Sequence, residues 1–143
     1  MKRQSSEDLI KLAFEYVKKA EKDAELNPAT DEIQVVICEP LKEPYKKIIP
    51  NKLESMQEIV DGYIEILTIG KTETNGTIAI TLNEEGKLND LPLNKIIHGR
   101  GGSDALVGTF FITAFNMQGD NISLSDGQCD RIIRLFKGTE VYL

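Results

Sequence analysis

The chain has 143 residues, a length typical of one domain, and 41% hydrophobic with 28% charged residues is an ordinary globular composition. Seventeen basic and 23 acidic side chains give a net charge of -6 at pH 7, which excludes a broadly basic face and predicts no direct nucleic-acid binding. No apolar run reaches the roughly 18 residues of a membrane span, so we expect a cytoplasmic protein that does not contact a membrane.

The first predicted element is an amphipathic helix within residues 1–28. Apolar side chains recur at helical spacing from Leu9 to Ala24, with charged residues on the opposite side. Ser5 and Asp8 form a candidate capping box, and Asn27 before a proline ends the helix. The helix either packs on the rest of the chain or extends to dock on a partner, and we expect it to pack.

A strand, an edge strand and a short helix follow. Residues 33–38 are β-branched and predict a buried strand, and residues 44–49 predict a weaker strand at a sheet edge because Pro50 follows. A helix is predicted over residues 53–60, with Asn51 as its N-cap and Gly62 closing it at positive φ.

A hairpin is the clearest β signal. Residues 63–69 and 77–82 predict two antiparallel strands joined around Asn75-Gly76. A connection of some twenty residues, 83–105, then leads to a long apolar strand that ends at Phe115. Connections of this length are functional or poorly ordered, because most are about 4–6 residues long.

The C-terminal part predicts a helix and a last strand. Ser123 or Ser125 caps a helix that runs to about Lys137, where Gly138 ends it, and residues 141–143 add a terminal strand. The whole chain, 1–143, is thus expected to be a single α+β domain. Its mostly antiparallel sheet of about five strands carries about three helices packed on one face. A crossover between residues 33 and 69 should be right-handed if its strands are parallel.

The order of these pieces resembles a known family. A short strand ends in Glu39-Pro40 and is followed by LESMQEIVDGYIEI, LNEEGKLNDLPLN, VGTFFI and SLSDGQ. This order over about residues 33–135 resembles domain-of-unknown-function family 3846, and the N-terminal helix lies outside the resemblance. The resemblance implies an accessory protein of phages, plasmids or other mobile elements of bacteria, and it supplies no catalytic residues.

A glycine-rich segment inside the long connection is the candidate site. Successive glycines can turn backbone N–H groups toward an anion, and an arginine adds a planar two-point contact. The alternative is a mobile surface loop, since the spacing matches neither a phosphate-binding loop with lysine nor a dinucleotide fingerprint. The candidate ligand-binding residues are His98, Gly99, Arg100, Gly101, Gly102 and Ser103, joined by Asn83 and Asn94 if these point into a cleft rather than serving a turn and a cap.

Catalysis and metal binding are less expected than binding. His98, Ser103 and Asp104 occur within seven residues, but triad residues usually come from separate elements, so a polar loop is the simpler interpretation. Cys38 and Cys129 are predicted to be reduced thiols buried in different elements, with no spacing typical of a metal site. We therefore expect no metal and no cofactor.

Two functions follow from these expectations. The first is a non-enzymatic binding module for a small anionic ligand. The second is an acidic protein-interaction module that inhibits a host defence or nucleic-acid-processing protein, for which the solvated acidic residues Glu39, Glu43, Glu54, Glu58 and Asp61 supply a surface. The sequence predicts no oligomeric state.

Overall fold

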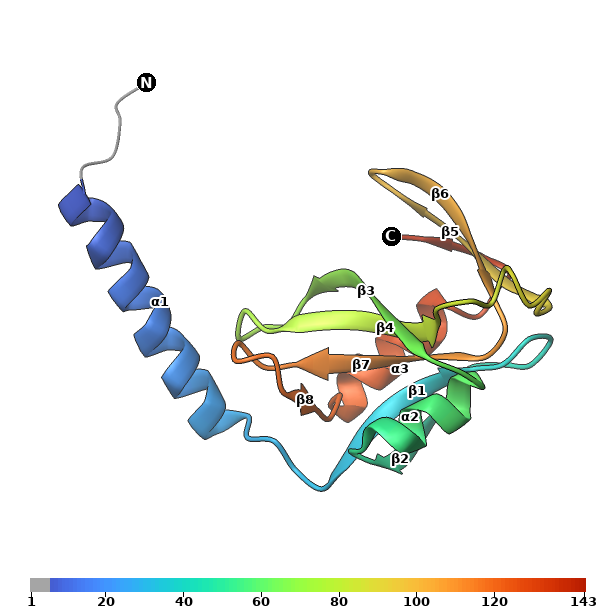
Figure 1. The fold of residues 1–143 in the computed structure, drawn as a ribbon, viewed down its shortest axis with the longest axis horizontal. Coiled ribbons are helices and arrows are strands. Elements are labelled where there is room, and N and C mark those ends of the chain that lie inside the picture. Colours follow the sequence, from blue (N-terminus) through green and yellow to red (C-terminus); the bar gives the residue numbers. More distant parts are fainter. Residues whose placement is uncertain (1–5) are drawn as a thin grey trace.

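A computed structural model describes residues 6–143, and Figure 1 shows their fold. The expected α+β class is confirmed, because helices and mostly antiparallel strands alternate irregularly along the chain. The elements are α1 (Ser6–Leu26), β1 (Glu32–Cys38), β2 (Tyr45–Pro50), α2 (Leu53–Val60), β3 (Ile64–Lys71), β4 (Thr77–Asn83), β5 (Leu93–Gly99), β6 (Gly102–Val107), β7 (Phe110–Phe115), β8 (Asn121–Ile122), α3 (Asp126–Leu135) and β9 (Glu140–Tyr142).

The larger sheet, here called sheet A, has the strand order β2-β1-β7-β4-β3, and β8 pairs with the end of β7. All its pairs are antiparallel. Ile112 of β7 lies in register with Val36 on one side and Ile80 on the other. The predicted edge position of β2 and the predicted β3–β4 hairpin are confirmed. β1 and β3 run in opposite directions. The expected right-handed crossover between them required parallel strands, so that expectation does not apply.

Both faces of sheet A carry a helix, so the expectation that the helices share one face is wrong. Ile33, Val35 and Ile37 of β1 pack in a cluster with residues of α2. Val36 and Cys38 belong to the other cluster, which contains residues of α3. Successive side chains of a strand point to opposite faces, and β1 is apolar almost throughout, so it supports a core on each side.

The region after β4 differs most from the prediction. The expected connection over residues 83–105 contains β5, and the expected long apolar strand is divided into β6 and β7. The division falls at Gly108, which has φ 73° and donates its N–H to the Pro92 carbonyl at 2.7 Å. An apolar run indicates burial, but it does not reveal that a left-handed glycine redirects the chain from one sheet to another.

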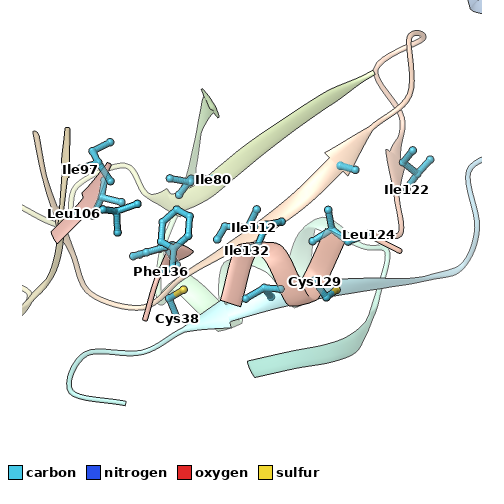
Figure 2. Packing of buried hydrophobic residues seen from close by; sticks show 14 residues of the cluster. Cys38, Ile80, Ile97, Leu106, Ile112, Ile122, Leu124, Cys129, Ile132 and Phe136 are labelled. Carbon is cyan, nitrogen blue, oxygen red and sulfur yellow. The ribbon is translucent and has the colours of Figure 1, made fainter. Parts of the chain in front are cut away.

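β5 and β6 form a second sheet, here called sheet B, with the order β6-β5-β9. The predicted terminal strand is confirmed as β9, which pairs in parallel with β5. Figure 2 shows the core cluster that joins the two sheets, in which Phe136 lies near Ile80 of sheet A and Leu106 of sheet B. The same cluster includes Ile97 and Val141, so sheet B packs on the face of sheet A that α3 also covers.

The caps of the short helices are partly as predicted. Ser125 and Gln128 form a capping box at the start of α3, which ends at Leu135 rather than near Lys137. In α2 the N-cap is Lys52 rather than Asn51, whose side-chain amide instead donates to the carbonyls of Thr30 and Asn121. Asp61, with φ 58°, takes the left-handed position at the end of α2 that was expected of Gly62.

The expected packing of α1 is wrong. Figure 1 shows α1 extending away from both sheets. Ala20 and Asp23 are its only buried residues among those described. Seven large apolar side chains of α1 are between 48% and 70% exposed, namely Leu9, Ile10, Leu12, Phe14, Tyr16, Val17 and Leu26. The predicted capping role of Ser5 lies outside the described residues. Over residues 6–143, no helix is both long enough and apolar enough to cross a membrane.

Candidate functional site

The glycine-rich segment forms the tip of the β5–β6 hairpin. Gly99 pairs with Gly102 across the hairpin, and Arg100 with Gly101 make the turn. Gly102 has φ 110°, a conformation that glycine adopts without strain. An added Cβ at Gly99, Gly101 or Gly102 would meet nothing within 4 Å. The segment is therefore a tight hairpin turn whose backbone is open to approach.

An open groove lies between this hairpin and β3. It has a volume of about 420 Å³. A second hollow of about 210 Å³ continues it toward the residue 84–88 turn, and the two share Leu67 and Asp104. We call the two together the inter-sheet groove. Its lining includes Glu65, Leu67, Thr68, Ile69, Leu82, Glu84, Lys87, Ile97, Gly99, Arg100, Gly102, Asp104, Ala105, Leu106 and Val107.

Arg100 is the cation at the hairpin end of this groove. Its side chain has no hydrogen-bond or ion-pair partner within residues 6–143, whereas Lys87 is bound to Asp104 with an Nζ–Oδ1 distance of 2.7 Å. Glu65 and Glu84 line the other end and are exposed. The groove therefore has a positive end at the hairpin tip and a negative end at the residue 84–88 turn.

His98 and Ser103 lie opposite each other in β5 and β6. His98 Nδ1 is 2.6 Å from Ser103 Oγ, and His98 Nε2 is 3.3 Å from Glu140 Oε1. The imidazole also stacks on Tyr142 with ring centroids 4.7 Å apart. Ser103, His98 and Glu140 resemble a triad in composition, but the serine contacts Nδ1 and the carboxylate Nε2, the reverse of the usual arrangement. None of these four residues lines the groove.

The third residue of the suspected triad lies elsewhere. Asp104 lines the groove and pairs with Lys87, so the structure brings together His98 and Ser103 but not Asp104. The carboxylate beside His98 is that of Glu140, which sequence reasoning missed. No local signal could have found it, because the contact depends on the parallel pairing of β9 with β5 across more than forty residues.

Both candidate asparagines are bonded to backbone groups. Asn83 Nδ2 donates to the carbonyls of Val60 and Asp61 at 3.1 and 3.0 Å, and its Oδ1 accepts from the N–H of Glu85 at 2.8 Å. It thereby satisfies carbonyls that the end of α2 leaves free. Asn83 lines the smaller hollow of the groove, beside the residue 84–88 turn, and does not line the hollow at the hairpin tip.

Asn94 connects the two sheets. Its Nδ2 donates to the Cys38 carbonyl at 3.0 Å and the Gly108 carbonyl at 2.8 Å. The side chain is buried, and its Oδ1 has no partner in the described part of the chain. Asn94 lines neither hollow of the groove, so its amide joins β1 to the turn between β6 and β7 instead of facing a ligand.

The two cysteines are free and buried in different elements, as predicted. Burial raises the pKa of the Cys38 thiol to about 12, against the opposing effect of the nearby Lys95 charge. Burial also raises the pKa of Cys129. Both thiols therefore stay protonated near neutral pH and are poor nucleophiles. Residues 6–143 contain no group of three or more His, Cys, Asp or Glu side chains placed to hold a metal ion.

These features define a class, a small α+β protein with an open groove between two sheets and, at one end of it, an arginine that has no partner among residues 6–143. The chain belongs to a family described as a domain of unknown function, DUF3846, whose model matches residues 33–137. α1 lies outside the match. Neither the curated proteins nor the solved structures include a significant match to the chain.

Proposed function

We propose that the protein is a non-enzymatic binding module that holds a phosphate- or carboxylate-bearing ligand at the hairpin end of the inter-sheet groove. The observation that carries this proposal is Arg100, an exposed guanidinium without a partner in the described residues, at the rim of a groove of about 420 Å³. A guanidinium binds planar oxyanions through two parallel hydrogen bonds. An accessory role in a bacterial mobile element, as the family resemblance implies, is part of this proposal.

The glycines on both sides of Arg100 also favour anion binding at the hairpin end of the groove. Nothing lies within 4 Å of an added Cβ at Gly99 or Gly101, so a ligand oxygen can approach their backbone without meeting a side chain. The carboxylates of Glu65 and Glu84 repel an anion at the far end. The charges therefore direct an anionic group toward Arg100.

A thermal-shift screen tests the proposal with inorganic phosphate, nucleoside phosphates and small dicarboxylic acids as probes. We expect at least one probe to raise the melting temperature of the wild type, because binding to the folded state alone stabilises it. Arg100→Ala should abolish the shift, and Arg100→Lys should reduce it because lysine lacks the planar fork. Arg134→Ala, an exposed arginine on α3, is the matched control. No shift in the wild type, or an equal shift in Arg100→Ala, contradicts the proposal.

A second candidate function is a protein-interaction module, and the exposed apolar side of α1 favours it. Isolated exposed apolar residues are common, but seven large ones on one helix support an interaction surface. The helix is held in position because Asp23 Oδ2 accepts from the N–H of Met117 at 2.7 Å and Asn116 Nδ2 donates to the Asn27 carbonyl at 3.0 Å.

We propose that this surface of α1 docks into an apolar groove of a basic partner protein, such as a host nucleic-acid-processing enzyme. Two copies of a chain with a net charge of -6 repel each other, whereas a basic partner is attracted. The test compares the wild type with Ile10→Asp/Phe14→Asp in binding to a purified candidate partner, with Glu15→Asp as the control. A candidate protein counts as the partner only if it binds the purified wild type and does not bind the double variant. Self-association of the purified wild type through α1 contradicts this candidate.

A further inference from the structure

The inter-sheet groove is bordered by two strands that, within residues 6–143, have no pairing partner on one side. β3 is the outermost strand of sheet A, and β6 is the outermost strand of sheet B. The residues of β3 in the groove include the consecutive Leu67, Thr68 and Ile69, and those of β6 include the consecutive Asp104 to Val107. Because successive side chains point to opposite faces, consecutive lining residues mean that each strand presents its edge to the groove.

A free edge exposes a row of backbone donors and acceptors, which is a template for pairing with another strand. Proteins often protect such edges with proline or lysine, and neither residue occurs from Ile64 to Gly70 of β3 or within β6. The bulge of β3 lies between Thr68 and Gly70, within the part that lines the groove, so regular pairing is expected from Ile64 to Thr68. Two free edges without proline or lysine that border one groove are suited to bind a single extended segment between them.

We infer that the inter-sheet groove binds an extended segment of a partner protein, which adds as a strand between β3 and β6 and joins sheet A to sheet B. This inference rests on the function proposed above, because Arg100 lies in the same groove and would hold an acidic group of that segment. Strand addition supplies affinity through backbone hydrogen bonds and selectivity through alternate side chains. β6 has six residues, so a segment of similar length can pair along all of it.

The lining of the groove defines the chemistry of the segment. The partly buried Leu67, Ile69 and Leu82 form an apolar part of the lining and favour apolar side chains at alternate positions of the segment. Arg100 at the hairpin end favours an acidic residue or a terminal carboxylate. The exposed carboxylates of Glu65 and Glu84 at the other end favour a basic residue. The expected segment is therefore apolar at every second position, with opposite charges at its two ends.

A selection from displayed random decapeptides on the full chain provides the probes. We expect enriched peptides with alternating apolar residues and one acidic and one basic residue near opposite ends. Synthetic copies should bind the wild type and lose at least about tenfold in affinity for Arg100→Glu, since a buried or partly buried charge pair becomes a repulsion. Arg134→Glu, a charge reversal on exposed α3, serves as the control and should leave affinity unchanged.

N-methylation of the peptide tests the pairing directly without altering the protein. The N–H groups of alternate residues in a strand point to opposite edges, so one set of positions pairs with β3 and the other with β6. Methylating either set should weaken binding of an inserted strand by about tenfold or more, because each set removes several hydrogen bonds. If only one set matters, the peptide pairs with a single edge, and insertion between the sheets is overturned. If neither set matters, or no peptide is enriched, strand addition is overturned.

The two proposals fail in different ways. A thermal shift with small anions that depends on Arg100, in the absence of peptide binding, supports the anion site and overturns strand addition. Peptide binding that is sensitive to both methylation sets but equal in Arg100→Glu supports strand addition and overturns the role of Arg100.

Discussion

Asn94 is the residue on which the junction of the two sheets depends most directly. Its amide serves two carbonyls from different parts of the chain, those of Cys38 and Gly108, in a buried position. Water does not reach this buried position as readily as it reaches the surface. Loss of the Asn94 donor therefore leaves the Cys38 and Gly108 carbonyls without this hydrogen bond. Among residues 6–143 its Oδ1 has no partner, so the amide contributes through the two N–H donations.

Asn94→Ala should therefore lower the free energy of unfolding by about 2 kcal/mol. Denaturation with urea, followed by circular dichroism, measures the change. Asn89→Ala replaces an exposed asparagine of the preceding turn and should change stability by less than about 0.5 kcal/mol. Equal effects of the two substitutions contradict the role given to Asn94.

Gly62 shows that a substitution can be harmful for a reason other than the one its sequence context indicates. The residue does not need positive φ, because Asp61 occupies the left-handed position. An added Cβ at Gly62 would, however, lie 2.6 Å from Asn83 Nδ2, which is fixed by hydrogen bonds to Val60 and Asp61. The requirement for glycine here is one of space.

We expect Gly62→Val to destabilise the fold by about 1–3 kcal/mol, as overpacking does. Gly70→Val is the matched control within β3, because nothing lies within 4 Å of its added Cβ. The melting temperatures of both variants decide the question. A midpoint of Gly62→Val at or above that of the control means that Asn83 moves aside without cost.

At the scale of elements, β9 is the least supported strand of sheet B. It has three residues, pairs with β5 alone in the described part of the chain, and is further attached by the stacking of Tyr142 on His98. Tyr142→Ala should weaken this attachment by about 1 kcal/mol, a typical contribution of an aromatic pair. Hydrogen exchange at the N–H of Leu143, which donates to the His98 carbonyl at 2.8 Å, reports the loss. Tyr63→Ala, an exposed tyrosine before β3, should leave that exchange unchanged.

The attachment of α1 depends on pH through Asp23. Burial raises the pKa of this carboxyl, but hydrogen bonds from the Met117 N–H and the Asn27 amide outweigh it and place the pKa below the ordinary value of 3.8. The carboxylate therefore stabilises the folded state above about pH 4, and this contribution is lost as the pH falls through the lower folded pKa. We expect the amides of α1 near Asn27 to lose protection in acid before those of sheet A. Asp23→Asn should remove this difference in pH dependence, and persistence of the difference in that variant contradicts the assignment.

The elements that could be predicted from sequence are those with local signals. Asn75-Gly76 indicated the β3–β4 hairpin, and Ser125, one of the two serines predicted as the N-cap, caps α3. β5 escaped prediction because Asn94, Lys95 and His98 interrupt its apolar residues, although Asn94 and Lys95 are buried. Lys95 is accommodated by donating its Nζ to the Gly138 carbonyl at 2.7 Å, a contact that no periodicity reveals.

The candidate site was also predicted only in part. Arg100 stood out as an arginine between glycines, and the hairpin register explains why His98 and Ser103 meet. The groove itself could not be predicted, because it is formed by residues of β3, β4, β5 and β6 in two sheets. Asn83 and Asn94 were predicted as site residues because they are polar. In the structure their side-chain amides donate to backbone carbonyls instead.

For the whole molecule, the position of Val141 in the core has a consequence for synthesis on the ribosome. Phe136 and Val141 are fully buried in the cluster that joins the two sheets, and β9 completes sheet B. While the chain is being translated, Ile80, Leu106 and Ile112 emerge well before these partners exist. The nascent chain must therefore keep an apolar surface exposed until residue 141 has left the exit tunnel. Transiently exposed apolar surface of this kind is prone to aggregation, so a translational pause before residue 136 is expected to prolong that exposure.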